Sequence, residues 1–163
     1  MLLQGSCHCG AVRFSIESRT VYPFMRCYCG ICRKTAGGGG YSINIMGLAD
    51  TLRVRGKRHI KAYRPWIDFP ERLERSEGLR HFCRECGSQL WVSDSRWPDL
   101  IHPHASAIDT PLPVPPEVNH IKLEDKASWV EVPRGPRHHR FDTFPAESIQ
   151  GWHRRMGLLG KGD

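Results

Sequence analysis

Short segments in which apolar and polar residues alternate recur along the first two thirds of the chain. A period of two is typical of strands that bury one face. It predicts strands at 11–16 (AVRFSI), 41–45 (YSINI), 52–55 (LRVR), 59–63 (HIKAY) and 89–92 (QLWV). Glycines fall between or beside these segments, where turns between antiparallel strands need permissive backbone angles. The pattern predicts a mainly β fold with antiparallel strands.

Helical features are confined to two stretches. A turn or two is expected after Cys32, through RKTA, and a C-terminal helix is expected from Pro145 to Met156, where proline comes first and basic residues come last. The segment 111–118 contains four prolines, which favours an extended connector over a regular element. Helix is therefore predicted to be a minor component.

The composition is that of a folded domain with a modest core. The 163 residues are 39% apolar and 25% charged, and 24 Lys and Arg against 17 Asp and Glu give a formal net charge of +7. At roughly 150 residues per domain this length predicts a single domain. The sequence has neither an apolar run of about 18 residues nor a start typical of a secretory signal. We therefore expect a cytoplasmic protein with no membrane partner.

The seven cysteines carry the strongest chemical signal, and an odd number cannot all form disulfides. Four pairs lie within three residues of each other, where random placement predicts about 0.8. Closely spaced cysteines form unstrained disulfides poorly, but they can present two sulfurs to one ion. Zinc ligation is therefore the leading hypothesis. The cysteines are Cys7, Cys9, Cys27, Cys29, Cys32, Cys83 and Cys86.

Their spacing divides them into a set of four and a set of three. Structural zinc takes four tetrahedral ligands, whereas catalytic zinc takes three protein ligands and leaves one position open. We expect Cys7, Cys9, Cys83 and Cys86 to form a closed site joining segments about 80 residues apart. Cys27, Cys29 and Cys32 would hold a second Zn²⁺ with a place for water or a substrate sulfur. Two zinc ions per chain would lower the formal charge from +7 to +4.

Two other uses of these cysteines stay open. Two structural zincs would need an eighth ligand, for which His8 or His81 is available. A redox dithiol is favoured less, because the chain lacks the βαβ pattern that usually accompanies it.

Four motifs carry a resemblance to a known family. They are GSCHCGAVRF at 5–14, RCYCGICRKTAG at 26–37, HFCRECGSQLW at 81–91 and NHIKLEDKASWV at 119–130. Together they resemble the glutathione-dependent formaldehyde-activating enzyme family, over residues 5 to about 132. The resemblance divides residues 1–163 into a core of about 5–132 and a C-terminal tail, 133–163.

The resemblance implies a fold, two metal sites and an activity. It implies an antiparallel β-tent zinc-binding fold in which Cys7, Cys9, Cys83 and Cys86 bind a structural zinc, and Cys27, Cys29 and Cys32 bind a catalytic one. It further implies a carbon–sulfur lyase that joins glutathione to formaldehyde, giving S-(hydroxymethyl)glutathione. A related thiol or small aldehyde is an open alternative. Zinc would favour the thiolate or polarise the carbonyl.

Other function classes are weighed against this enzyme. Centromere protein V shares the domain, so a zinc-binding interaction or structural module is the alternative. Nucleic-acid binding by the basic stretches 53–61 and 134–140 is less favoured, because no recognition helix or stacking motif accompanies them. The sequence leaves the oligomeric state open.

Several residues outside the cysteines have two interpretations. Arg33 and Lys34 either hold a peptide carboxylate or are solvated charges, and Gly37 to Gly40 form a mobile loop near the open zinc or a plain turn. His102 and His104 either line the zinc cleft or, as we favour, one packs on a strand and the other is exposed. His120 has no assignable role. Trp91 and Trp129 are expected in the core.

Overall fold

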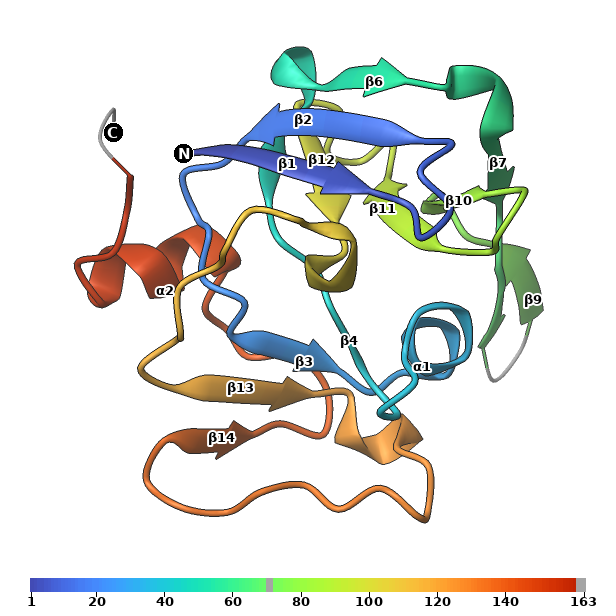
Figure 1. Cartoon of the computed structure of the whole chain (residues 1–163). Helices are drawn as coiled ribbons and strands as arrows, with labels where there is room; N and C mark the ends of the chain where they lie inside the picture. The colour runs from blue at the N-terminus through green and yellow to red at the C-terminus, as the bar shows by residue number, and fades with distance from the viewer. Residues whose placement is uncertain (70–71, 161–163) are drawn as a thin grey trace.

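Strand pairing organises the described part of the chain into four sheets (Figure 1). The computed structural model describes residues 1–69 and 72–160, excepting the side chains of residues 68 and 69. A three-stranded sheet has the order β1 (Leu2–Ser6), β2 (Arg13–Glu17), β6 (Arg53–Arg55). A five-stranded sheet has the order β5 (Gly47–Leu48), β12 (Leu100–Pro103), β11 (Gln89–Ser93), β10 (Leu79–Cys83), β7 (Ile60–Tyr63). A four-stranded sheet has the order β14 (His138–Arg140), β13 (Val118–Ile121), β3 (Met25–Cys27), β4 (Ser42–Ile43), and β8 (Trp66–Phe69) pairs with β9 (Arg72–Arg75).

The fold is mainly β, as the alternating pattern predicts. All described strand pairings are antiparallel except those of β13, which runs parallel to both β3 and β14. The described α-helices are two short ones, α1 (Gly30–Thr35) and α2 (Ile149–Arg155). Single 3-10 turns occupy Ala49–Thr51, Lys57–His59, Ala105–Ala107 and Leu123–Asp125. None of the described helices is long and apolar enough to cross a membrane.

The segments predicted to be strands coincide with β2, β4, β6, β7 and β11, with ends shifted by up to two residues. The helix expected after Cys32 begins earlier, at Gly30, so that this cysteine lies inside it. The C-terminal helix is shorter than predicted, because the Ser148 hydroxyl caps it by accepting a 3.0 Å hydrogen bond from the Gly151 N–H. The proline-rich segment has no strand before Val118, as expected.

The main core lies between the three-stranded and five-stranded sheets. Inward-facing side chains of β1 and β2 pack against β11, with the rings of Phe14 and Trp91 edge to face at 5.2 Å between centroids. Trp91 is therefore a core residue, as predicted. Trp129 is not, because it is 68% exposed. The turn closed by the hydrogen bond from the Val130 N–H to the Ala127 carbonyl buries those two residues and leaves Trp129 outside.

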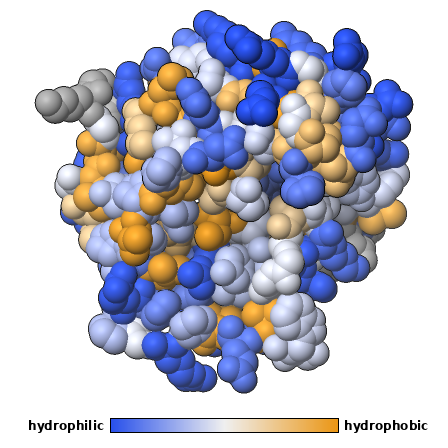
Figure 2. All heavy atoms as spheres, in the orientation of Figure 1, coloured by the Kyte–Doolittle hydropathy of each residue, from blue (hydrophilic) through white to orange (hydrophobic). Residues whose placement is uncertain are grey.

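The C-terminal segment packs against the strands before it. Trp152 of α2 is fully buried and stacks on Phe24, with 3.8 Å between ring centroids. Its indole N–H donates a 2.7 Å hydrogen bond to Glu117, which also pairs with Arg155. Residues 161–163 of the expected tail lie outside the described residues. On the face drawn in Figure 2, polar and apolar side chains are mixed, with polar ones dense along the edge formed by β6.

Candidate functional site

The loop after β1 presents the first two cysteines of the four-cysteine cluster, defined as Cys7, Cys9, Cys83 and Cys86. The Cys7 carbonyl accepts a 3.0 Å hydrogen bond from the Gly10 N–H, which closes the turn. The Val12 N–H lies 3.2 Å from the Cys7 Sγ. Gly10 has φ +74°, a conformation that glycine adopts without strain. The CxC spacing thus becomes a knuckle with both sulfurs on one side.

The turn after β10 supplies the other two cysteines. The Cys83 carbonyl accepts a 2.8 Å hydrogen bond from the Gly87 N–H, and Gly87 has φ +74°. Hydrogen bonding to Ser88 lowers the pKa of Cys86 to about 5. A thiol that ionises readily at neutral pH is prepared for metal binding.

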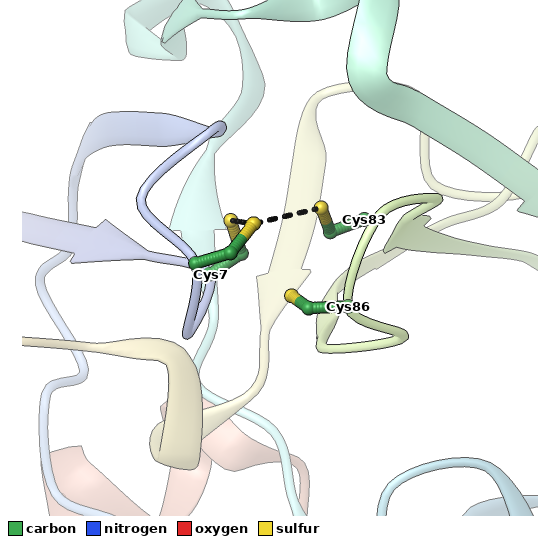
Figure 3. Close-up of side chains that lie close together, drawn as sticks. Cys7, Cys83 and Cys86 are labelled. Carbon is green, nitrogen blue, oxygen red and sulfur yellow. Dashed lines mark hydrogen bonds between the residues drawn. The ribbon is translucent and has the colours of Figure 1, made fainter.

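The two turns bring all four sulfurs together, as Figure 3 shows for the labelled Cys7, Cys83 and Cys86. All four lie within 4.8 Å of one another, with Cys9 Sγ 3.5 Å from Cys7 Sγ and 3.8 Å from Cys83 Sγ. Four sulfurs at 2.3 Å from a tetrahedral ion are about 3.8 Å apart. The donor set therefore fits a four-coordinate metal ion.

The three-cysteine cluster, defined as Cys27, Cys29 and Cys32, forms where β3 passes into α1. Its sulfurs also lie within 4.8 Å of one another. Cys29 is the N-cap of α1, and its Sγ lies 3.4 Å from the Cys32 N–H. Tyr28 points the other way: it is buried against Ala127 and Val130. Three thiols that converge from a strand end and a helix fit a metal ion that has one position left for another ligand.

Arg80 of β10 reaches the three-cysteine cluster from the opposite sheet. Its Nη1 lies 3.7 Å from Cys32 Sγ, while its Nε has no hydrogen-bond partner among the described residues. Hydrogen bonds from the Cys27 and Cys29 thiols, together with the positive charge of Arg80, hold the pKa of Cys32 well below its ordinary value. Arg80 was not predicted as a site residue, since nothing in the segment LRHFC distinguishes it from a solvated arginine.

A cavity of about 390 Å³ opens beside the three-cysteine cluster. Cys27, Arg80 and His102 line it, together with apolar side chains from seven segments of the chain. His102 packs edge to face on Trp97, with 4.5 Å between ring centroids. A reactive group and a partly open space for a small molecule are therefore contiguous.

The expectation that one of His102 and His104 is exposed is wrong. His102 lines the cavity and His104 is fully buried, because β12 lies inside the five-stranded sheet and the chain beyond it stays covered. Burial lowers the pKa of each to about 4, so both are neutral at pH 7. Neither ring nitrogen of His104 has a hydrogen-bond partner among the described residues.

The other histidines considered in the sequence contribute no ligand atom to either cluster. His81 hydrogen-bonds Ser93 at 2.9 Å and stacks on Trp91, and His8 is exposed. His120 is fully buried, where its Nδ1 and the Tyr28 hydroxyl form a 2.8 Å hydrogen bond. Among the described residues, neither His8 nor His81 joins a group of potential metal ligands.

A second, more polar groove of about 800 Å³ runs along α1. Arg33 and Lys34 line it, as do residues of the two turns that form the four-cysteine cluster. Gly37 to Gly40 form a tight turn at its edge, closed by a 2.9 Å hydrogen bond from the Gly40 N–H to the Gly37 carbonyl. A Cβ on Gly40 would lie 2.3 Å from Val130, so this turn requires glycine there.

Comparisons with known proteins agree with this geometry. Residues 2–125 match the family model described as "Glutathione-dependent formaldehyde-activating enzyme". A Halomonas elongata protein described as "Putative glutathione-dependent formaldehyde-activating enzyme" is 57% identical over 158 residues, which are 97% of this chain and 98% of the relative. A crystal structure of a Rhodobacter sphaeroides protein matches with a TM-score of 0.51 and 27% identity, over 68% of this chain and 91% of that one. With both cysteine clusters inside the matched region, the chain belongs to the glutathione-dependent formaldehyde-activating enzyme family.

Proposed function

We propose that this protein is a zinc-dependent carbon–sulfur lyase. In the synthetic direction it adds the thiol of glutathione to formaldehyde or another small aldehyde, and with formaldehyde the product is S-(hydroxymethyl)glutathione. The observation that carries the proposal is a cluster with three thiols, one short of a closed tetrahedral site, beside a partly open cavity. The family and the relative's description support glutathione and formaldehyde as substrates.

Both metal sites are assigned to Zn²⁺, two per chain. Sets of four and three cysteine sulfurs at tetrahedral separations are typical zinc ligands. Cys7, Cys9, Cys83 and Cys86 would hold a structural ion, and Cys27, Cys29 and Cys32 a catalytic one. When bound by three thiolates, zinc supplies Lewis acidity that stabilises a substrate thiolate or polarises a carbonyl. We also propose a cytoplasmic location, where thiols stay reduced.

The chain's own residues supply binding and charge. Arg80 contacts Cys32 and lines the cavity, so its guanidinium is placed to donate hydrogen bonds to the carbonyl oxygen as negative charge develops there. Arg33 and Lys34 in the polar groove are placed to pair with the carboxylates of glutathione.

The reaction involves no oxidation or reduction. A bond forms between the sulfur and the carbonyl carbon, and the π bond of the carbonyl breaks. The proton that leaves the thiol ends on the oxygen, which becomes a hydroxyl. His102 lines the cavity in its neutral form at pH 7, so this imidazole can pass a proton between solvent and the reacting oxygen.

Zinc content measured together with activity tests this proposal. Wild-type protein should hold two zincs per chain and accelerate the glutathione–formaldehyde exchange followed by NMR. Cys29→Ser should hold one zinc, keep its circular dichroism spectrum and lose at least about 100-fold in rate. The matched control, Cys86→Ser, removes a thiol from the other cluster and should keep activity in its folded fraction.

Two results would contradict the proposal. Two zincs per chain without acceleration would contradict the proposed reaction. One zinc per chain in the wild-type protein would contradict the assignment of a second metal site. Activity in Cys29→Ser equal to that of the wild type would remove the three-cysteine cluster from the chemistry.

A further inference from the structure

The cavity beside the three-cysteine cluster is much larger than a one-carbon molecule. Its volume is about 390 Å³, within the range of roughly 300–1,000 Å³ found for small-molecule sites. A molecule the size of water occupies about 30 Å³ in the liquid, and formaldehyde has only two non-hydrogen atoms. Formaldehyde alone would leave most of the cavity wall in contact with water.

The wall of the cavity is mainly apolar. Six large apolar side chains reach it from β3, α1, β8, the segment after β11, the loop before α2 and α2 itself. Burial of such surface against a ligand is favourable, whereas its exposure in a water-filled cavity is not. These side chains are Met25, Ile31, Ile67, Trp97, Phe144 and Ile149.

The polar groups of the cavity include those that contact the cysteines. Arg80 reaches Cys32, and Asn44 follows β4, which pairs with β3 at Cys27. The Asn44 Oδ1 is buried and has no hydrogen-bond partner among the described residues. Asp94 also lines the cavity, but Arg96 holds its carboxylate in hydrogen bonds of 2.6 and 2.9 Å. A ligand that has a polar group at its reacting carbon and an apolar substituent beyond that carbon would match this arrangement.

Part of this wall comes from outside the region that defines the family. The family model ends at residue 125, whereas Phe144 and Ile149 come later in the chain. Trp152, stacked on Phe24 and hydrogen-bonded to Glu117, fixes α2 in place. The C-terminal segment thus adds an apolar surface to the site, and this chain need not share its substrate with every member of the family.

We infer that the preferred aldehyde carries an apolar substituent of about four to eight carbons, aliphatic or aromatic, that fills this cavity. The inference rests on the proposed function and names its substrate class. The sulfur of glutathione bonds to the carbonyl carbon, the thiol proton ends on the oxygen, and the product is a hemithioacetal whose carbinol carbon bears the apolar group. Glutathione itself occupies the polar groove along α1 in this scheme.

A series of straight-chain aldehydes tests the inference. With zinc-loaded protein and glutathione, kcat/KM should rise roughly fourfold for each added methylene from propanal to hexanal, the ratio that corresponds to the transfer free energy of one methylene. Formaldehyde should be the poorest substrate relative to its uncatalysed rate. Direct binding of 1-hexanol, which has no carbonyl, should appear in saturation-transfer NMR with the same protein.

Variants connect the effect to the cavity wall. Ile149→Phe fills the cavity, so it should remove most of the preference for hexanal over propanal and abolish 1-hexanol binding. Its far-UV circular dichroism spectrum should match that of the wild type. The matched control is Val114→Ala, at an 82% exposed position away from the cavity. It should change neither the preference for hexanal over propanal nor the binding of 1-hexanol.

The outcomes separate this inference from the proposed function. If formaldehyde is accelerated but longer aldehydes are not, and 1-hexanol does not bind, the inference is overturned and the proposed function stands. If no aldehyde is accelerated, both fail, even if 1-hexanol binds. A chain-length preference that Ile149→Phe leaves unchanged would also overturn the assignment to this cavity.

Discussion

The two cysteine clusters present the same ligand type in different surroundings. The four-cysteine cluster joins two surface turns, with Cys9 and Cys86 exposed, and its sulfurs complete a tetrahedron by themselves. The three-cysteine cluster is enclosed between sheets, with Arg80 against it and a cavity beside it. A local turn thus places each pair or trio of neighbouring sulfurs, whereas the ligand number of the complete site and the chemistry open to it depend on which distant segments pack around it.

The largest expected effect comes from removing a buried thiol of the four-cysteine cluster. Cys83→Ser should lose one zinc and destabilise the fold by more than about 5 kcal/mol, because that site joins segments about 80 residues apart and metal binding contributes directly to folding. Chemical denaturation and metal analysis measure both effects. Cys32→Ser, the matched change in the other cluster, should lose one zinc with a much smaller loss of stability. Equal destabilisation by the two variants would contradict the division of roles.

The second effect concerns the C-terminal helix α2, whose Ile149 lines the cavity beside the three-cysteine cluster. Trp152→Ala should cost about 3–5 kcal/mol, because it removes a fully buried aromatic side chain and leaves a void against Phe24. Guanidinium denaturation measures the loss. Trp129→Ala, at a position 68% exposed, is the control and should stay within about 0.5 kcal/mol of the wild type. A small effect at Trp152 would mean that α2 does not support the cavity wall.

The sequence contains the local part of this architecture but not its assembly. Cysteine spacing and glycine positions predict the two knuckles, because a turn depends on neighbouring residues. Alternation finds β2, β6 and β11, but it does not find β3 and β14, which lie outside the segments that alternate with a period of two. The pairing of β13 with both of them is a tertiary outcome.

The residues that distinguish the three-cysteine cluster are likewise set by tertiary packing. Arg80 is separated from Cys32 by 48 positions, and no local sequence pattern predicts which strand packs against α1. The same reason accounts for Trp129: an aromatic side chain in a family-like motif suggests burial, while the short turn that carries it directs the side chain outward.

The third effect is acid lability of the enclosed region. Burial lowers the pKa of His104 and of His120 to about 4, with the positive charges of Arg80 and Arg26 adding to the effect. Below the unfolded pKa of about 6.5 the unfolded chain binds protons that the native chain excludes. Each histidine therefore contributes stability that is present above pH 6.5 and is lost as pH falls toward 4, by roughly 3 kcal/mol in full.

Denaturation curves at pH 7.0 and pH 5.0 measure this loss. His120→Asn removes one of the titrating imidazoles and should reduce the pH dependence by that histidine's share, since the amide does not titrate in this range. Zinc content must be followed in parallel, because thiolates also take up protons in acid. A pH dependence that is unchanged in His120→Asn would show that this imidazole is not the group that titrates.

The smallest effect concerns Tyr28, whose side chain packs against Ala127 and Val130 while its neighbours Cys27 and Cys29 belong to the three-cysteine cluster. The Tyr28 hydroxyl forms a 2.8 Å hydrogen bond with His120 Nδ1 of the neighbouring β13. Tyr28→Phe keeps the ring and removes one buried hydrogen bond, so it should cost about 1 kcal/mol. Zinc per chain should stay at two and the exchange rate should stay within about twofold of the wild type, because the lost group faces away from the sulfurs. If this variant instead lost a zinc or most of its activity, the Tyr28 side chain and its packing partners would belong to the site. The cysteine chemistry would then not be separate from the packing behind it.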